Sequence, residues 1–165
     1  WPFPENTYAY SNERRLFGSG RFYHPDERAM FIYSEPQSLP EETDEEYPFV
    51  LLTGRGSSSQ WHTQTRTEKS DVLKKLYPEN CYFEVNAKDA RSQGIVPNQK
   101  VLIASRRGEV EATAFVVNTV NRGQIFMPMH YVKTNQLTHG SFDPHSRQPS
   151  YKYAAVRITP ISENL

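Results

Sequence analysis

Short runs of alternating apolar and polar residues, separated by Gly, Asn and Pro, recur along the chain from about residue 47 onward. Alternation with a period of two over four to eight residues is typical of strands that bury one face. Turn signals at 106–108 and 121–123 separate some of these runs. The pattern predicts six strands, at 49–53, 82–85, 101–104, 110–117, 124–127 and 154–159. Many short strands with few helices favour a mainly β fold, built as a small barrel.

Two short helices are predicted between the strands. Ser70 can cap the start of a helix over 70–76, and Asn86 can cap a helix over 87–93. Gly94 can end the second helix in the left-handed conformation, which glycine adopts without steric cost. The helices are therefore insertions in a β-barrel rather than a layer of their own.

Residues 1–46 show no sustained periodicity and are rich in Pro, Tyr, Glu and Asn. They are predicted to form an irregular arm that links a preceding domain to a barrel over 47–165. Three segments of the arm have the composition of short strands: 15–17, 21–23 and 29–33. The acidic run 41–46 is predicted to be a solvated linker at the domain boundary, because clusters of like charge are usually exposed.

Composition narrows the possible functions. Lys and Arg number 19, as do Asp and Glu, so the formal net charge is zero, whereas nucleic-acid-binding domains are usually basic. The sequence shows neither an apolar run long enough for a transmembrane helix nor a secretory signal. Its single cysteine, Cys81, is too few for an internal disulfide or a thiolate metal site. We therefore expect a cytoplasmic protein whose partner is neither a nucleic acid nor a membrane.

The segment 53–67 carries the richest chemistry. It follows a buried apolar run and combines glycines, hydroxyl side chains, two arginines, an indole and an imidazole. Glycines let the backbone come close, N–H and O–H groups donate hydrogen bonds, and guanidinium groups bind oxyanions in a bidentate manner. This set suits a phosphate-bearing aromatic ligand, although no Gly-Lys-Ser/Thr follows to make a P-loop. The candidate binding residues are Thr53, Gly54, Arg55, Gln60, Trp61, His62, Thr63 and Thr65.

Several of these residues have plainer interpretations. Trp61 is equally well explained as a core residue, which is the common place for a lone tryptophan. Thr63, Thr65 and Thr67 would share one face of an extended segment, where they would either donate to phosphate or support a strand. Cys81 is better explained as a small buried residue than as a reactive thiolate.

Two rival kinds of site are disfavoured by sequence spacing. The histidines considered as metal ligands show neither helical pairing nor an accompanying Cys or Glu-x-x-His pattern; they are His62, His130, His139 and His145. A hydrolase triad built from the serines at 57–59, His62 and Asp71 would lack a Gly-x-Ser-x-Gly elbow. We therefore predict no catalytic residue and no protein metal site in this chain.

A series of short motifs runs in order through residues 47–160: Thr53-Gly54-Arg55, Gln60-Trp61-His62-Thr63, Asp89-Ala90 with Gly94-Ile95, Ser105-Arg106-Arg107-Gly108-Glu109-Val110, Met127-Pro128-Met129-His130, Asn135-Gln136-Leu137-Thr138, Asp143-Pro144 and Tyr151-Lys152-Tyr153-Ala154-Ala155-Val156-Arg157. Together these motifs resemble the C-terminal dinucleotide-binding domain of the molybdopterin oxidoreductases, the family of formate dehydrogenases, nitrate reductases and dimethyl sulfoxide reductase. Each motif is short, but their order makes the resemblance specific.

The resemblance implies a six-stranded double-psi β-barrel with short helical insertions, which caps a much larger catalytic subunit. It implies the cofactor bis-molybdopterin guanine dinucleotide (bis-MGD) with molybdenum, and places a [4Fe-4S] cluster and the molybdenum ligand in other domains. It also adds four residues to the candidate cofactor contacts: Met129, His130, Asn135 and Lys152. Sequence alone would make Lys152 a solvated surface lysine. The domain would orient and tune the cofactor and would be catalytically silent by itself.

Within the family, the segments 60–67 and 135–139 are most similar to cytoplasmic assimilatory nitrate reductases. This implies reduction of nitrate to nitrite with electrons from a separate donor. A formate dehydrogenase is the alternative within the family, and a double-psi barrel adaptor that binds proteins is the alternative outside it. The run 56–59 is one residue longer than the family pattern, so we assign no individual phosphate contacts there.

Overall fold

The computed structural model describes residues 16–33, 35–56, 64–144 and 146–162. Its internal contacts divide the chain into two compact units, Trp1–Ser38 and Leu39–Leu165. The acidic run 41–46 therefore belongs to the second unit.

The described part of the first unit contains no strand. The expectation of short strands in the arm is therefore wrong at the described residues of 15–17, 21–23 and 29–33. A strand needs a neighbour to pair its backbone groups, whereas the side chains of 30–33 are exposed, Phe31 by 97%. The local order in this unit comes from turns and aromatic contacts: the Phe22 N–H donates to the Glu27 carbonyl at 2.9 Å, and the rings of Phe17 and Phe22 stack with 4.6 Å between their centroids.

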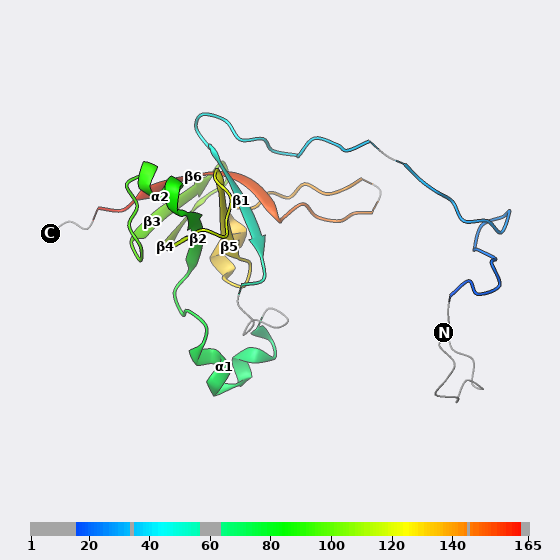
Figure 1. Cartoon of the computed structure of the whole chain (residues 1–165), viewed down its shortest axis with the longest axis horizontal. Helices are drawn as coiled ribbons and strands as arrows, with labels where there is room; N and C mark the ends of the chain where they lie inside the picture. The colour runs from blue at the N-terminus through cyan, green and yellow to red at the C-terminus, as the bar shows by residue number, and fades with distance from the viewer. Residues whose placement is uncertain (1–15, 34, 57–63, 145, 163–165) are drawn as a thin grey trace. The chain divides into compact units, whose positions relative to one another are not determined.

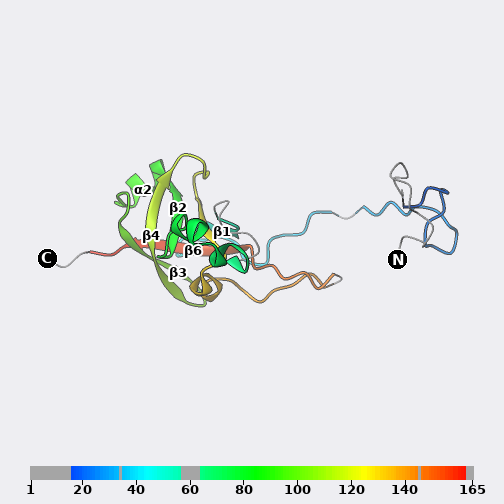
Figure 2. The same ribbon diagram turned by 90° about the horizontal axis from the view of Figure 1, so that it is seen from below.

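The second unit contains a closed barrel of six strands (Figures 1 and 2). The strands are β1 (Phe49–Gly54), β2 (Tyr82–Asn86), β3 (Lys100–Ser105), β4 (Glu109–Val117), β5 (Gln124–Pro128) and β6 (Tyr153–Pro160). Their order around the barrel is β1-β5-β2-β4-β3-β6. Each predicted strand is present with its ends shifted by about one residue at most, which confirms the mainly β barrel.

The strand pairing shows two interlocked halves, β1–β3 and β4–β6. β1 pairs in parallel with β5, and β4 pairs in parallel with β2. β1 also pairs antiparallel with β6, and β4 antiparallel with β3. Exchanging the first half for the second therefore leaves the pairing pattern unchanged. Each half supplies a parallel partner to the other, and this interlocking confirms the double-psi β-barrel.

The apolar residues of the alternating pattern that predicted the strands also fill the inside of the barrel with their side chains. Along β1 every second residue is buried and the residues between are half-buried. The largest fully buried side chains come from several strands: Phe83, Leu51, Ile103, Ile125 and Met127. Burying a side chain of this size stabilises the fold by about 1.5–3 kcal/mol, so the barrel interior is the main source of stability.

The connections hold two α-helices and two described 3₁₀ segments: η2 (Thr67–Lys69), α1 (Asp71–Lys75), α2 (Ala87–Ser92) and η3 (Val132–Gln136). Ser70 caps α1 by accepting the Leu73 N–H at 3.4 Å, and Asn86 caps α2 by accepting the Lys88 N–H at 2.9 Å. Gly94 follows α2 with φ of +68°. Both predicted helices are thus confirmed. In the described ranges, no helix combines the length and apolar character needed to cross a membrane.

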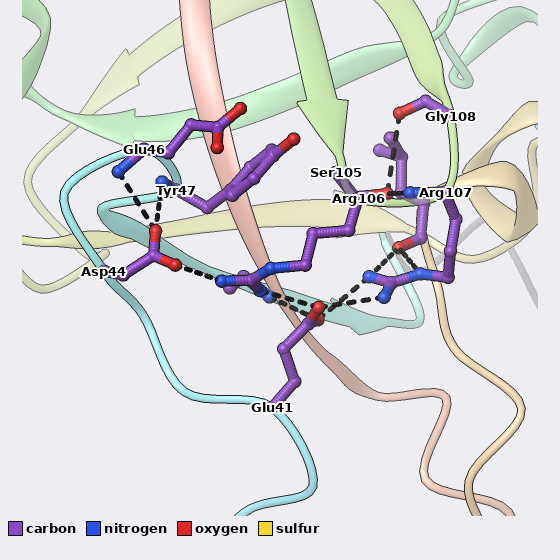
Figure 3. A network of polar contacts seen from close by, with 10 residues as sticks. Glu41, Asp44, Glu46, Tyr47, Ser105, Arg106, Arg107 and Gly108 are labelled. Atoms are coloured by element: carbon purple, nitrogen blue, oxygen red, sulfur yellow. Dashed lines mark hydrogen bonds and ion pairs between the residues drawn. The ribbon is translucent and has the colours of Figure 1, made fainter.

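The acidic run departs from a solvated linker at Glu41 (Figure 3). The Glu41 side chain is only 10% exposed. Its carboxylate accepts hydrogen bonds from Arg106 at 2.8 Å and from Arg107 at 2.9 Å, both in the turn between β3 and β4. It also accepts the N–H of Ala155 in β6 at 2.9 Å. The prediction of a solvated residue is wrong here, because long-range donors that no local pattern reveals surround this one carboxylate.

Two neighbours extend the contacts of Glu41. Asp44 pairs with Arg106 and accepts the Tyr47 N–H at 2.7 Å (Figure 3). The Tyr47 ring lies 4.7 Å from the Arg106 guanidinium and 5.4 Å from that of Arg157, within the range of cation–π attraction. Ion pairs, hydrogen bonds and cation–π contacts therefore hold the segment 41–47 against the barrel before β1 begins.

Asp89 of α2 joins the two halves of the barrel. Its buried carboxylate accepts the N–H of Gly123, the residue before β5, at 2.6 Å.

We expect Asp89→Ala to lower the free energy of unfolding by about 2 kcal/mol, because a charge-assisted hydrogen bond is lost and its donor is left without a partner. Urea denaturation followed by circular dichroism measures the change. Asp89→Asn keeps one oxygen acceptor and should lose less; equal losses would contradict this role.

Candidate functional site

The carboxyl ends of the parallel strands β1 and β5 form one edge of the barrel. The register pairs Gly54 with Pro128, and the Met129 N–H donates to the Gly54 carbonyl at 2.8 Å beyond that pair. Parallel strands run in the same direction, so the segments that leave them begin side by side. The structure thus brings the predicted residues 53–55 next to the predicted residues 129–130.

The start of β6 lies at the same edge. The Thr53 N–H donates to the Lys152 carbonyl at 3.1 Å, and the Thr53 hydroxyl donates to the Tyr151 carbonyl at 2.9 Å. Thr53 is buried, whereas Lys152 is exposed. Both donors of Thr53 are therefore used within the chain, and this residue fixes the backbone that carries the Lys152 ammonium group.

Arg55 and His130 are close enough to interact electrostatically at this edge. Burial lowers the pKa of His130, and the positive charge of Arg55 lowers it further. Both ring nitrogens of His130 are buried, and neither has a hydrogen-bond partner among the described residues. At neutral pH the ring is therefore uncharged and has one N–H donor and one acceptor nitrogen to offer. Buried polar atoms are rarely left unpaired, so this ring fits a site that a ligand completes.

Asn135 and Met129 are held near the end of β5 by the backbone. Thr134, the residue before Asn135 in η3, donates its buried hydroxyl to the Pro128 carbonyl at 2.9 Å. Asn135 is exposed and Met129 is half-buried. An exposed amide offers both a donor and an acceptor to a heterocyclic ring.

The threonines after the loop do not form the expected extended segment. Thr65 lies in a turn, and Thr67 is buried in η2. They therefore do not present one row of hydroxyls to a ligand. The remaining candidates, Gln60, Trp61, His62 and Thr63, lie outside the described residues, as does most of the run 56–59.

Sequence reasoning missed two residues that shape the site. A Cβ on Gly54 would lie 3.1 Å from the Phe126 ring, a tight contact that a larger residue could make only if the ring shifted. Tyr151 supplies the carbonyl that holds the Thr53 hydroxyl. Both contacts depend on the register between strands that are far apart in the sequence, and a single sequence does not reveal that register. The position of Tyr151 in the final family motif was the only hint of its role.

The described residues of this site offer groups that suit the binding of a polar ligand. Two exposed cations, Arg55 and Lys152, suit oxyanions, and the neutral His130 ring suits a polar edge. In the described part of the chain, no group of three or more His, Cys, Asp or Glu side chains is placed to hold a metal ion. His62 and His145, two of the histidines weighed as metal ligands, lie outside that part.

Cys81 is half-buried before β2. Burial raises the pKa of its thiol to about 11, against smaller opposing effects of Lys133 and Thr134. At pH 8 its thiolate fraction should be about 100-fold below that of a free cysteine, because the fraction of thiolate falls about tenfold for each unit by which the pKa is raised further above the pH. We expect a correspondingly slow reaction of the intact chain with Ellman's reagent. Urea should restore the normal rate, and a fast reaction of the folded chain would contradict the burial.

Known proteins share this combination of sequence and fold. Residues 49–155 match the model of the molydopterin dinucleotide binding domain. A nitrate reductase of Synechocystis is 38% identical over 155 residues, which cover 90% of this chain and 21% of that protein. The F420-dependent formate dehydrogenase 2 subunit alpha of Methanococcus maripaludis is 36% identical over 143 residues, covering 86% of the chain and 21% of that protein. The chain thus spans about a fifth of the length of these relatives.

Two further similarities bear on the fold and on the range of relatives. The assimilatory nitrate reductase catalytic subunit of Bacillus subtilis is 31% identical over 166 residues, covering 98% of the chain and 23% of that protein. Acetylene hydratase from Pelobacter acetylenicus superposes with a TM-score of 0.59 at 14% identity, over 70% of this chain and 19% of that one. At so low an identity, the second similarity concerns the fold alone.

Proposed function

The chain belongs to the molydopterin dinucleotide binding domain family, and on that premise we propose that its β1/β5 edge holds the pyrophosphate of molybdopterin guanine dinucleotide. The observation that carries the proposal is the placement of Arg55 beside His130, whose two buried ring nitrogens have no partner in the described part of the chain. A guanidinium group binds a phosphate oxygen pair with directed hydrogen bonds. Lys152, whose backbone carbonyl accepts the Thr53 N–H, adds a second exposed cation at the start of β6.

The other residues of the edge have complementary roles. The neutral His130 ring would donate to or accept from a polar ring edge, and Asn135 offers the same pair of functions. Gly54 has no Cβ and therefore leaves room for the Phe126 ring. The bound group, with its molybdenum, supplies the redox chemistry, while this chain binds and orients it. The family match favours this function over a protein-binding adaptor.

We propose further that the longer protein reduces nitrate to nitrite in the cytoplasm, with bis-MGD, a [4Fe-4S] cluster and an electron donor supplied outside this chain. The support is the 38% identity to the Synechocystis nitrate reductase and the 31% identity to the assimilatory subunit of Bacillus subtilis. Formate oxidation is the second candidate, favoured by the 36% identity to the formate dehydrogenase subunit. Assays of the longer protein for nitrite formation and for formate consumption discriminate between the two.

Calorimetric titration of the 165-residue chain with GDP tests the binding function. GDP carries the guanine nucleoside and pyrophosphate of the proposed cofactor. We expect saturable binding of one GDP per chain, weakened by added salt because ionic contacts are screened. AMP, with one phosphate and a different base, is the matched control and should bind more weakly. Equal affinity for both nucleotides would contradict a guanine dinucleotide site.

A further inference from the structure

The turn between β3 and β4 lies against η3, the 3₁₀ segment that carries Asn135. A Cβ on Gly108, in this turn, would lie 3.1 Å from the Gln136 carbonyl oxygen, so the two segments are in close contact. Two hydrogen bonds close the turn: the Ser105 N–H donates to the Gly108 carbonyl at 2.9 Å, and the Arg107 N–H donates to the Ser105 hydroxyl at 3.2 Å (Figure 3). The turn therefore fixes the backbone from which the Arg107 side chain extends.

The Arg107 side chain binds the end of η3. Its Nε and one terminal nitrogen donate to the Leu137 carbonyl at 3.2 and 2.9 Å. Leu137 is the C-cap residue of η3, and its side chain is fully buried in the barrel core. The last carbonyl groups of a helical segment lack partners within it, and a basic side chain can satisfy them. Arg107 therefore caps η3 from a distant part of the sequence.

The same guanidinium group also binds Glu41. Its two terminal nitrogens donate to the two oxygens of the Glu41 carboxylate, both at 2.9 Å (Figure 3). The side chains are only 29% exposed for Arg107 and 10% exposed for Glu41, so water competes little for these contacts. A bidentate pair fixes the plane of the guanidinium group. Glu41 therefore orients the group that meets the Leu137 carbonyl.

Asn135 lies between two fixed points of η3. On the side toward β5, the buried Thr134 hydroxyl donates to the Pro128 carbonyl at 2.9 Å. On the other side, Arg107 binds the Leu137 carbonyl, and the Leu137 N–H donates to the Thr134 carbonyl at 3.1 Å. Asn135 itself is exposed, so the backbone on its two sides determines where its amide group lies.

We infer that Arg107 is a positioning residue for Asn135: it fixes the end of η3 and thereby holds the Asn135 amide in place for the ligand. This inference rests on the proposed function, in which Asn135 offers a donor and an acceptor to a ring of the ligand. Arg107 does not touch the ligand in this role. A segment that is ordered before binding loses less conformational entropy on association, so the cap of η3 should strengthen ligand binding.

Arg106 is the matched control for Arg107, because it is the neighbouring arginine in the same turn. It also donates to Glu41, at 2.8 Å, and it forms its other described ion pair with Asp44. Arg106→Ala and Arg107→Ala therefore both remove a partner of Glu41, whereas only Arg107→Ala removes the donor to the Leu137 carbonyl. A difference between the two variants reports on η3 rather than on Glu41.

Amide hydrogen exchange of the unliganded 165-residue chain, followed by NMR, tests the effect of Arg107 on η3. The Leu137 N–H reports on η3 because it donates to the Thr134 carbonyl. Relative to the amides of β2, we expect it to exchange about tenfold faster in Arg107→Ala than in the parent, and at the parent rate in Arg106→Ala. Equal exchange in Arg107→Ala and the parent, or equal acceleration in both variants, would overturn the inference.

Calorimetric titration with GDP tests whether Arg107 acts through Asn135. Arg107→Ala should weaken GDP binding about fivefold, and Arg107→Lys should weaken it less because an ammonium group still reaches one acceptor. Arg106→Ala should bind as the parent does. In an Asn135→Ala background, Arg107→Ala should have no further effect, since the residue that it positions is gone. An equal loss in both backgrounds would overturn the inference.

The two measurements separate this inference from the proposed function. If Arg55→Ala weakens GDP binding and Arg107→Ala does not, the proposed function is supported and the inference is overturned. If the parent chain does not bind GDP, the proposed function is contradicted, and the exchange rate of the Leu137 amide still decides whether Arg107 fixes η3. Thermal melting checks that each variant is folded at the temperature of the titrations.

Discussion

Replacing Glu41 by Gln is expected to lower the free energy of unfolding by about 2 kcal/mol at pH 7. The substitution removes the charge that two arginines and the Ala155 N–H share, while the arginines stay near the barrel surface. The cost is below that of a fully buried pair, because Arg106 and Arg107 are 36% and 29% exposed and water can solvate them. Urea denaturation of the variant and the parent chain measures the difference.

The effect of Glu41 should depend on pH. Burial alone would raise its pKa, but hydrogen bonds from Arg107, the Ala155 N–H and Arg106 outweigh burial and lower the pKa to about 2 from 4.5. A carboxyl group with a lowered pKa stabilises the folded state above its unfolded pKa, and this stabilisation is lost as pH falls from 4.5 toward 2. The difference between the parent and Glu41→Gln should therefore shrink over that interval.

Glu46→Gln is the matched control within the same acidic run. Glu46 pairs with Arg157, but their side chains are 65% and 45% exposed. Exposed pairs contribute little, so this variant should stay within about 0.5 kcal/mol of the parent. Equal losses in the two variants would contradict the special role of Glu41.

Arg55→Ala should weaken GDP binding about 10- to 100-fold, the second large effect. The variant removes the guanidinium group that faces the pyrophosphate in the proposed site. Arg55→Lys keeps the charge without the forked geometry and should lose less. Arg91→Ala, at an exposed arginine of α2, should bind as the parent does. Calorimetric titration at fixed salt measures all four affinities.

The Arg55 variant has a second readout in the unliganded chain. Because the charge of Arg55 helps to lower the pKa of His130, Arg55→Ala should raise that pKa toward its usual value. NMR titration of the His130 ring reports the change. Unchanged titration with unchanged GDP affinity would show that the two side chains do not share a site.

The strands and helices were predictable because their signals are local. β1 and β4 alternate with a period of two, and Ser70 and Asn86 mark helix starts by their own side chains. The arm was not predictable in the same way. The composition of 29–33 suits a strand, but a strand forms only where a neighbour pairs with its backbone.

Part of the site was predictable for a similar reason. Gly54 and Arg55 follow a strand end, where ligand-binding loops commonly lie. The parallel pairing of β1 with β5 places His130 beside Arg55, and a pattern of apolar residues contains no information about that pairing. Glu41 shows the same limit, since its partners lie 65 to 114 residues away. The resemblance to the family, rather than periodicity, pointed to Met129, His130, Asn135 and Lys152.

The most direct test of the central claim is an amide NMR titration of the isotopically labelled chain with GDP. The account predicts saturable shifts that concentrate at residues 54–55, 129–131 and 152, and that weaken in Arg55→Ala. Shifts that concentrate elsewhere, for example at the turn between β3 and β4, would contradict the assigned site. A folded chain without saturable shifts would contradict the claim that this edge binds the nucleotide by itself.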